Sequence, residues 1–435
     1  DSIKVIRIVN KLRKEFKKEI KVFDIYDSGT LSGLIPIIEN YTPANSNYND
    51  KLKETESEFE IIKNSLLPFH PDRDNIEDIF PMSDIQSGMV YASLLDPEQA
   101  IYHDQFVYKL SGKIEGKVFE KALHLMSEKH SILRTAFNMD IYTEGVQIVY
   151  KSVKVVPEHI ELFKAADEEA VSFIKTYFRN ERAKPFEISK APLWRASLVY
   201  LKERTVFLFQ FHHAILDGWS VATFLTELNN LYLKLIADNE ATKLPTLKSS
   251  YKDYVLESFT EKKDGENKEF WINELSDYKR TDILTHEHTS QRFCKTFSKD
   301  YFENLIERSK EDGLTIKGLM FGAFLYSISL LTNEDEVTAG LVTNNRPLKE
   351  DSEKVLGCFL NTIPFRYKNN RNTSTWKNYF EQIESKINEL KKRDRASLLD
   401  IVKFTGEKIV NENPFFDVLF NFVNFHVLDN LENDL

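Results

Sequence analysis

The segment with the clearest potential for chemistry is FHHAILDGWS, which spans residues 211–220. In it His212 and His213 are adjacent, and Asp217 and Gly218 follow a short distance after the second histidine. Histidine is the side chain whose ordinary pKa lies nearest neutrality, so it can accept a proton from an attacking amine or alcohol. A histidine pair alone is more often structural, but the full pattern H-H-x-x-x-D-G is much rarer and indicates a catalytic segment.

The residues after the histidines predict how this segment is held in place. We expect Asp217 to maintain the shape of the loop through an ion pair. Gly218 permits backbone conformations that are closed to other residues. Trp219 and the helix beyond it are expected to pack the loop down.

The elements that position the histidines are predicted from the apolar periodicity. Two strands, at 193–200 and 206–211, are joined by a short turn, and the second runs directly into His212. A long helix at 220–236 follows. A helix at 31–39 is expected to have Ser28 or Thr30 as its cap. The remaining prediction is of helices at 51–67, 84–95, 118–129, 315–332 and 374–391, and of strands at 104–110, 336–342 and 415–426.

The overall composition limits the classes of function. At roughly 100–200 residues per domain, 435 residues predict two to four folded units. The net charge of −10 argues against nucleic acid as a partner, because phosphate binding requires a concentrated positive field. Cys294 and Cys358 are far apart, so we expect no metal site and no redox pair, and we place the protein in a reducing cytoplasm. The longest apolar run, around 318–331, is too short and too polar to cross a membrane.

Further segments along the chain carry a family resemblance. Together with FHHAILDGWS they resemble, in order, the motifs of the condensation domains of non-ribosomal peptide synthetases, in the superfamily that includes chloramphenicol acetyltransferase. The resemblance covers residues 79–426, and a set of motifs in one order is far more specific than any single one. The segments are MSDIQSGMVYASL (82–94), EKHSILRTAF (128–137), SYKDYV (250–255), AGLVTNNRP (339–347), VLGCFLNTIPFR (355–366) and NPFFDVLFNFVNFH (413–426).

The resemblance implies an α/β fold and an amide-forming reaction. Two chloramphenicol acetyltransferase-like lobes, here 79–257 and 258–435, would form a V-shaped pseudo-dimer with a tunnel between them, the second lobe incomplete at its C-terminus. The donor acyl or peptidyl group would arrive as a thioester on an upstream carrier domain in the same chain. It would pass to the amine of an aminoacyl group on a downstream carrier. Other synthetase modules, such as adenylation domains, are implied as further partners.

The resemblance also implies roles for the histidine segment. His213 matches the second histidine of the family, which would orient or deprotonate the amine and stabilise the tetrahedral state. Which of these roles dominates stays open. His212 is expected to shape the loop, and Gly218 to place its backbone near the reacting carbonyl.

Asp217 is interpreted as a structural residue of the active site. Arg346 and Arg134 both lie in matching motifs and are its two candidate partners, with Arg346 favoured. A buried carboxylate without its partner would be costly.

The first residues resemble the C-terminal part of a peptidyl carrier domain. DSIKVIRIVNKLRKEF (1–16) and FDIYDSGTLSGLIPII (23–38) match the carrier from its phosphopantetheine serine onward. Ser2 would carry 4'-phosphopantetheine, and a phosphate ester is well placed at a helix N-terminus. Asp-Ser before a helix is otherwise an ordinary N-cap. We assign 1–41 to an incomplete carrier and 42–78 to a linker.

Four other functions are weighed against amide formation. An epimerisation domain shares H-H-x-x-x-D-G, but it would use a glutamate where this chain has AGLVTNNRP. A heterocyclising domain would replace the histidine motif with paired aspartates. An acyltransferase that uses coenzyme A would have no need of the upstream carrier. A catalytically silent docking platform would be expected to lose the histidine or the glycine, and both are intact.

Overall fold

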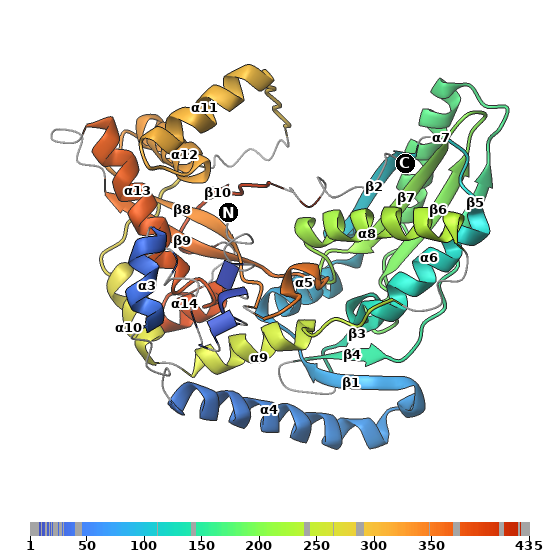
Figure 1. Cartoon of the computed structure of the whole chain (residues 1–435), viewed down its shortest axis with the longest axis horizontal. Coiled ribbons are helices and arrows are strands. Elements are labelled where there is room, and N and C mark those ends of the chain that lie inside the picture. The colour runs from blue at the N-terminus through green and yellow to red at the C-terminus, as the bar shows by residue number, and fades with distance from the viewer. Residues whose placement is uncertain are drawn as a thin grey trace. The chain divides into compact units, whose positions relative to one another are not determined.

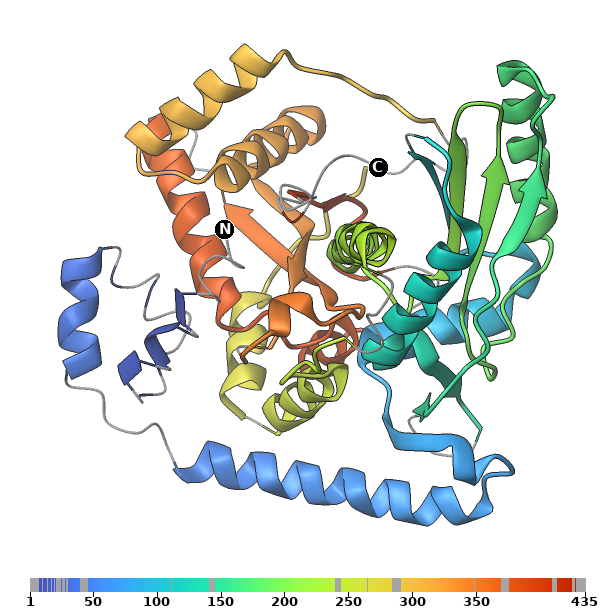
Figure 2. The same cartoon turned by 45° about the vertical axis from the view of Figure 1, so that its right-hand side comes forward.

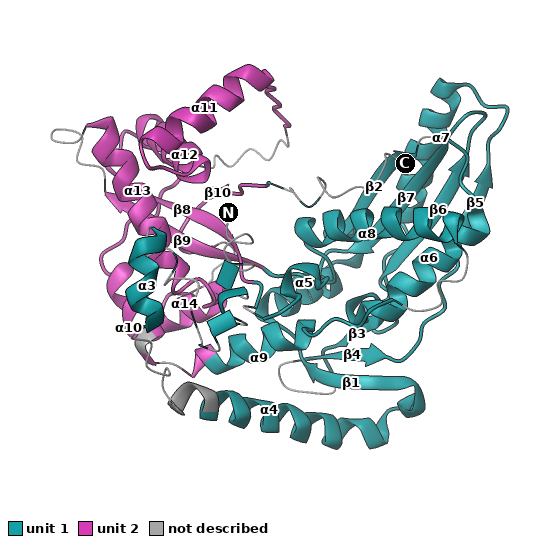
Figure 3. Cartoon of the chain, viewed as in Figure 1, with its two compact units in different colours: residues 1–260, 346–359, 424–435 teal, residues 261–345, 360–423 magenta. Residues whose placement is uncertain are grey.

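The computed structural model describes most of the chain from residue 46 onward and parts of the preceding segment (Figure 1). It divides into two compact units, residues 1–260, 346–359 and 424–435 and residues 261–345 and 360–423 (Figure 3). The described residues are 8–9, 11–13, 15–16, 18, 20, 25, 28, 30–39, 46–110, 112–140, 145–238, 244–263, 265–283, 291–347, 349–368, 375–408, 413–424 and 427.

The first unit is built on a four-stranded sheet in the order β2-β7-β6-β5. The strands are β2 (His103–Leu110), β5 (Glu158–Glu161), β6 (Trp194–Tyr200) and β7 (Thr205–His212). β7 pairs antiparallel with both β2 and β6, while β5 joins the edge of β6 in parallel. The strand that ends at His212 is therefore held on both sides by backbone hydrogen bonds.

Helices cover both faces of this sheet, which explains why every residue of β7 is buried. Side chains alternate between the two faces of a strand. Phe207 contacts α6 and Phe209 stacks on α8, while Val206 and Leu208 pack against α7 on the opposite face (Figures 1 and 2). The three helices are α6 (Gly116–Lys129), α7 (Asp167–Arg182) and α8 (Gly218–Ala237). The almost continuous apolar run of β7 follows from this double coverage.

A second sheet, in the order β1-β4-β3, completes the first unit together with four more helices. The expected linker helix is longer than predicted and belongs to this unit, because Phe59 of α4 is buried between Phe80 and Phe259. The helix at 31–39 begins and ends as predicted, with the Gly33 N–H donating to Thr30 Oγ1 at 3.1 Å. The elements are α3 (Leu31–Glu39), α4 (Ser46–Leu66), β1 (Ile76–Pro81), α5 (Asp84–Leu95), β3 (Thr135–Asn138), β4 (Val146–Tyr150) and α9 (Tyr251–Lys262).

The second unit contains a three-stranded sheet in the order β10-β8-β9. Its elements are α10 (Gly265–Glu274), α11 (Lys299–Glu311), α12 (Ile316–Thr332), β8 (Glu336–Asn344), β9 (Leu360–Lys368), α13 (Trp376–Lys391), α14 (Leu398–Thr405) and β10 (Leu419–Phe420). In the part of the chain described, no single helix is long and apolar enough to cross a membrane; α11 and α12 pass that test only jointly, across a 99° bend.

The strand predicted at 415–426 is wrong in its extent. Within the described part of this segment, a strand forms only at Leu419 and Phe420, which pair in parallel with β8, and Phe416 adds an isolated parallel bridge to Thr281. Phe415 and Phe416 are instead buried in the core of the second unit, and residues 425 and 426 lie outside the described residues. The apolar alternation that predicted a strand here serves core packing over much of its length.

The predicted lobe boundary at 257/258 also needs correction. The first unit ends near it, at residue 260, but segment 346–359 returns to the first unit although 258–435 was assigned to one lobe. The reason is a set of hydrogen bonds in which Asp217 N donates to Gly357 O at 3.0 Å and Ser220 Oγ donates to the same carbonyl at 2.7 Å. Gly357 also lies so close to the Tyr251 ring that a Cβ there would collide with it.

We predict that Gly357→Ala destabilises the protein by about 1–3 kcal/mol, because the added methyl group must displace the buried Tyr251 ring. Gly88→Ala is the matched control, since Gly88 is an exposed helical position with nothing within 4 Å of the new Cβ. The control should leave stability equal or raise it by about 0.5–1 kcal/mol. Urea unfolding followed by fluorescence measures both, and equal free energies for the two variants would contradict the close approach.

Candidate active site

The end of β7 and the start of α8 place the histidine segment. β7 ends at His212, and Asp217 is the N-cap of α8, accepting the Ser220 N–H at 2.7 Å. The residues between, Ala214 to Leu216, are fully buried. A short turn fixed at both ends therefore carries His213, and Gly218 forms the first residue of the helix.

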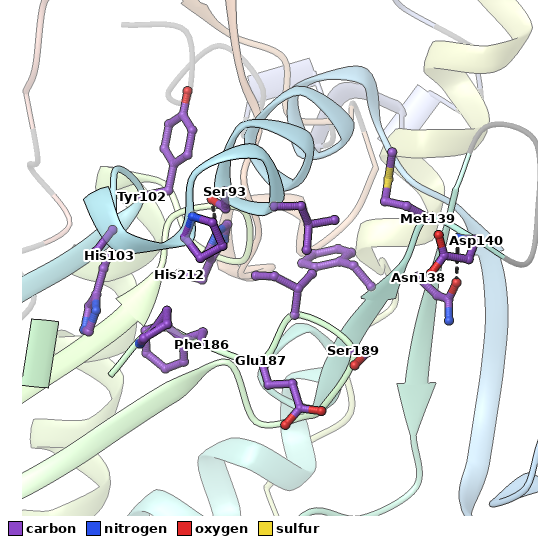
Figure 4. Close-up of a pocket in the computed structure, with 16 residues that line it drawn as sticks. Ser93, Tyr102, His103, Asn138, Met139, Asp140, Phe186, Glu187, Ser189 and His212 are labelled. Carbon is purple, nitrogen blue, oxygen red and sulfur yellow. Dashed lines mark hydrogen bonds between the residues drawn. The ribbon is translucent and has the colours of Figure 1, made fainter. Parts of the chain in front are cut away.

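His212 is buried and held through both ring nitrogens. The Ala214 N–H donates to Nδ1 at 3.2 Å, so the proton must lie on Nε2, which is 2.9 Å from Ser93 Oγ (Figure 4). Burial, followed by the neighbouring His213, lowers the pKa of His212 to about 4. His212 is thus a neutral residue near pH 7 whose two ring nitrogens are both engaged in hydrogen bonds within the turn.

His213 has the opposite environment. Its side chain is 26% exposed, its backbone N–H donates to Tyr102 O at 2.9 Å, and its Nδ1 lies 2.6 Å from Asp104 Oδ2. Among the described residues no hydrogen-bond partner lies on Nε2. Burial alone lowers the pKa of His213, but the hydrogen bond and charge of Asp104, together with the charge of Asp217, raise the pKa above its ordinary value.

Asp104 is a site residue that no motif in the sequence indicated. The strand at 104–110 was predicted, but its pairing with the strand that ends at His212 was not. In the structure Asp104 is opposite Phe211, and just beyond the paired residues the His213 N–H donates to Tyr102 O, which brings the His213 ring to Asp104. A carboxylate at the start of an otherwise largely apolar strand was the available signal, and it indicated no partner by itself.

Asp217 is paired with Arg346. Its Oδ1 lies 3.3 Å from Arg346 Nη2, and its Oδ2 accepts the Phe359 N–H at 3.1 Å. Both side chains of the ion pair are completely buried, and the guanidinium lies over the Phe359 ring at 4.1 Å. Ser220 Oγ accepts from Arg346 Nη2 at 2.8 Å, so a single polar network joins the turn, α8 and segment 346–359.

Arg134, the alternative partner of Asp217, lies elsewhere, and that alternative is wrong. Its Nη1 is 2.7 Å from Glu77 Oε2, and its Nε donates to Ser127 O at 2.8 Å. The first bond joins the turn after α6 to β1, and the second joins it to the end of α6. The guanidinium also donates hydrogen bonds to two further backbone carbonyls. All of its described hydrogen bonds therefore go to groups outside the histidine segment.

The other two predicted residues have different outcomes. Trp219 is buried and donates from Nε1 to Glu353 O at 3.2 Å, so it packs the start of α8 against segment 346–359. Ser2 lies outside the described residues.

A cavity of about 250 Å³ adjoins the buried histidine (Figure 4). Its wall includes His212 and Tyr102 but not His213, and the Tyr102 side chain extends away from the other residues drawn. The remaining lining residues are Ser93, Leu94, Pro97, Ala100, His103, Phe137, Asn138, Met139, Asp140, Pro185, Phe186, Glu187, Ile188 and Ser189. This cavity lies entirely within the first unit, and its surface is mostly apolar.

A family model described as "Condensation domain" matches residues 76–435. The chain belongs to the condensation-domain family. Its fold agrees with that of solved condensation domains. One is from the Monacolin K polyketide synthase MokA, with a TM-score of 0.64 and 18% identity over 80% of this chain and 82% of that one. Another is the first condensation domain of the CDA synthetase, with a TM-score of 0.64 and 17% identity over 79% and 80%.

Curated relatives of this condensation domain are much longer proteins. Bacitracin synthase 1 of Bacillus licheniformis is 29% identical over 320 residues, which is 71% of this chain and 6% of the relative. Bacitracin synthase 3 of the same organism is 27% identical over 304 residues, which is 67% of this chain and 5% of the relative. The condensation domain therefore spans only a small part of these relatives.

We predict that Arg346→Met destabilises the condensation domain by about 3 kcal/mol or more, because it leaves the buried Asp217 carboxylate without its cation. The control Arg308→Ala removes an arginine that is 75% exposed and should change stability by less than about 0.5 kcal/mol. The measurement is the free energy of unfolding in urea for both variants. Equal losses of unfolding free energy in the two variants would show that the Asp217–Arg346 pair does not stabilise the fold.

We also predict that His212→Asn weakens the pH dependence of stability. The pKa of His212 is about 4 when folded and near 6.5 when unfolded, so the unfolded state binds the extra proton and stability falls as pH drops through this window. Between pH 7.5 and pH 5 this linkage amounts to about 2 kcal/mol. Urea unfolding of the parent protein and of His212→Asn at the two pH values measures this difference. The same change in unfolding free energy in both proteins would contradict the prediction.

Proposed function

We propose that this condensation domain forms amide bonds in non-ribosomal peptide synthesis. The donor is an acyl or peptidyl thioester on an upstream carrier domain, and the acceptor is the amine of an aminoacyl group on a downstream carrier. The observation that carries the proposal is His213, whose side chain is partly exposed directly after the end of β7 in the segment H-H-x-x-x-D-G. The names of the relatives, Bacitracin synthase 1 and Bacitracin synthase 3, describe enzymes of synthesis and support an enzymatic role of this kind.

The reaction needs one base and no redox partner. The lone pair of the acceptor amine attacks the thioester carbonyl carbon, the C–N bond forms, and the C–S bond then breaks. His213 Nε2 takes the proton lost by the amine and returns it to the departing sulfur. Because a protonated amine nitrogen in the tetrahedral state is far more acidic than an alcohol, positioning of the amine by Nε2 contributes alongside proton transfer.

The surrounding residues keep this imidazole in place. The Asp217–Arg346 pair and the Ser220 hydroxyl fix the turn from one end, and the buried His212 fixes it from the other. Since His212 stays neutral, it adds no positive charge beside His213. Gly218, at the N-terminus of α8, is where helix N–H groups begin, and a helix N-terminus favours developing negative charge such as that of the tetrahedral oxyanion.

The carrier domain and its 4'-phosphopantetheine group are proposed from the sequence. Ser2 is the residue that we assign to 4'-phosphopantetheine, because it begins a segment that resembles a carrier from that serine onward. Adenylation domains would load the carriers, and the reaction would take place in the cytoplasm. The assignment of 1–41 to a carrier domain belongs to the same proposal.

We predict that His213→Ala lowers amide formation by about 100-fold or more, because the loss removes the group that takes the amine proton. The purified chain would be given donor and acceptor carriers loaded with acyl and aminoacyl groups, and mass spectrometry of the carriers would measure the product. His124→Ala removes an exposed surface histidine and should leave turnover within about twofold.

Both variants must match the parent protein in circular dichroism and in the urea midpoint of unfolding. A difference in turnover then reflects the catalytic step and not a loss of folded protein. A correctly folded His213→Ala variant with parental turnover would overturn the proposed enzyme and favour a silent docking platform. An equal loss of turnover in His213→Ala and in His124→Ala would show that the effect is not specific to the active site.

A further inference from the structure

We propose that Asp104 is a positioning residue for His213, which fixes the imidazole as the Nδ1–H tautomer and thereby presents Nε2 as the bare acceptor to the attacking amine. This inference rests on the proposed function of His213 and adds a carboxylate–histidine pair to it. The pair joins residues that are 109 positions apart in the sequence.

The geometry behind the proposal comes from the pairing of two strands. β2 and β7 pair continuously from His103 opposite His212 to Leu110 opposite Thr205. Next to Asp104 on the same face, Phe106 and Phe211 stack with ring centroids 5.7 Å apart and planes 2° apart. The carboxylate therefore comes from a strand whose register is fixed by the full ladder and by packed aromatic side chains.

Two hydrogen bonds to the start of β2 and the residue before it hold His213 itself. The His213 backbone N–H donates to Tyr102 O at 2.9 Å, and the ring Nδ1 lies 2.6 Å from Asp104 Oδ2. In the part of the chain described, Asp104 has no other hydrogen-bond or ion-pair partner for its side chain. A backbone anchor and a side-chain anchor together determine both the position and the orientation of the ring.

The chemistry of the two groups then assigns the protons. An ionised carboxylate only accepts hydrogen bonds, so Nδ1 must carry the proton and the lone pair of the neutral ring is on Nε2. Without such a partner the proton is free to reside on either nitrogen, and one of the two forms has no lone pair at Nε2. Asp104 removes that second form.

Asp104 also faces the charge that develops when Nε2 takes a proton. The charged and titratable groups around the ring are Asp104 from β2, Asp217 from the start of α8 and His212 from β7. His212 is neutral near pH 7, so the two carboxylates dominate and raise the pKa of His213 despite its partial burial. The imidazolium formed during the reaction is thus paired with a carboxylate already in place.

Asp217 does not take this role. Its two oxygens are engaged by the Ser220 and Phe359 N–H groups and by the Arg346 guanidinium. Its charge is already compensated within the buried network, and no hydrogen bond to the His213 ring is seen among the described contacts. The carboxylate of the family motif therefore shapes the turn, and a carboxylate outside the motif supports the imidazole.

The first experiment is NMR of the full chain labelled with ¹³C and ¹⁵N in histidine, with the His213 signal assigned from its absence in His213→Ala. At pH values above the pKa of His213, the parent protein should show the Nδ1–H tautomer. Asp104→Asn should lower the pKa of His213, because the hydrogen bond and the charge of Asp104 both raise that pKa, and it should produce a mixture of tautomers. Asp104→Glu should retain a raised pKa in part, and the surface control Asp167→Asn should change neither property.

The second experiment is amide formation by the same variants as a function of pH with loaded carriers. The neutral ring is the form that accepts a proton, so the rate rises with pH through the pKa of His213. Asp104→Asn should lose on the order of tenfold or more on the alkaline plateau. Its acid limb should move to lower pH, so the ratio of parent to variant rates shrinks as pH falls. The acceptor amine titrates identically in both proteins, so the comparison isolates His213.

A merely structural role predicts a different result. In that case Asp104→Asn would lower the rate by one factor at every pH, and the pKa and tautomer of His213 would stay as in the parent protein; either observation overturns the proposal. Failure of the proposed function is distinguishable, because it appears as parental turnover in His213→Ala. The NMR measurement of the pair is independent of turnover.

Discussion

The buried Asp217 carboxylate is the interaction on which the rest of the site depends. Its oxygens accept from the Ser220 and Phe359 N–H groups and from Arg346, and all of these partners are buried. A buried charge is tolerated only when it is paired and hydrogen-bonded. The network therefore requires segment 346–359 to return to the first unit, and it fixes the turn that carries His213.

The two histidines of the motif are adjacent in sequence but have different surroundings. His212 is the last residue of β7 and is enclosed, so its pKa falls to about 4. His213 is the first residue beyond the strand and points to a partly open side next to Asp104, so its pKa rises. The two imidazoles have different partners: His212 meets the Ser93 hydroxyl and the Ala214 N–H, whereas His213 meets the Asp104 carboxylate. One imidazole maintains structure while the other stays available for chemistry.

The rigidity of this arrangement comes from the central position of β7. Hydrogen bonds to β2 and β6 and packing against α6, α7 and α8 leave no face of the strand free to shift. A register slip of one residue would exchange the faces of Phe209 and Leu208 and would move His213 away from Tyr102 and Asp104. The sheet thus positions the site with the same contacts that form its core.

The sequence by itself determined the local features of this protein. Caps and periodicity placed the helices at 31–39 and 84–95, and the motif order identified the family and the histidine segment, because these signals are contained in short stretches of chain. Only the tertiary structure decided which segments meet: Asp104 beside His213, Arg346 rather than Arg134 on Asp217, and segment 346–359 in the first unit. The physical reason is that strand pairing and buried ion pairs join residues distant in sequence. Neither composition nor periodicity specifies the partner.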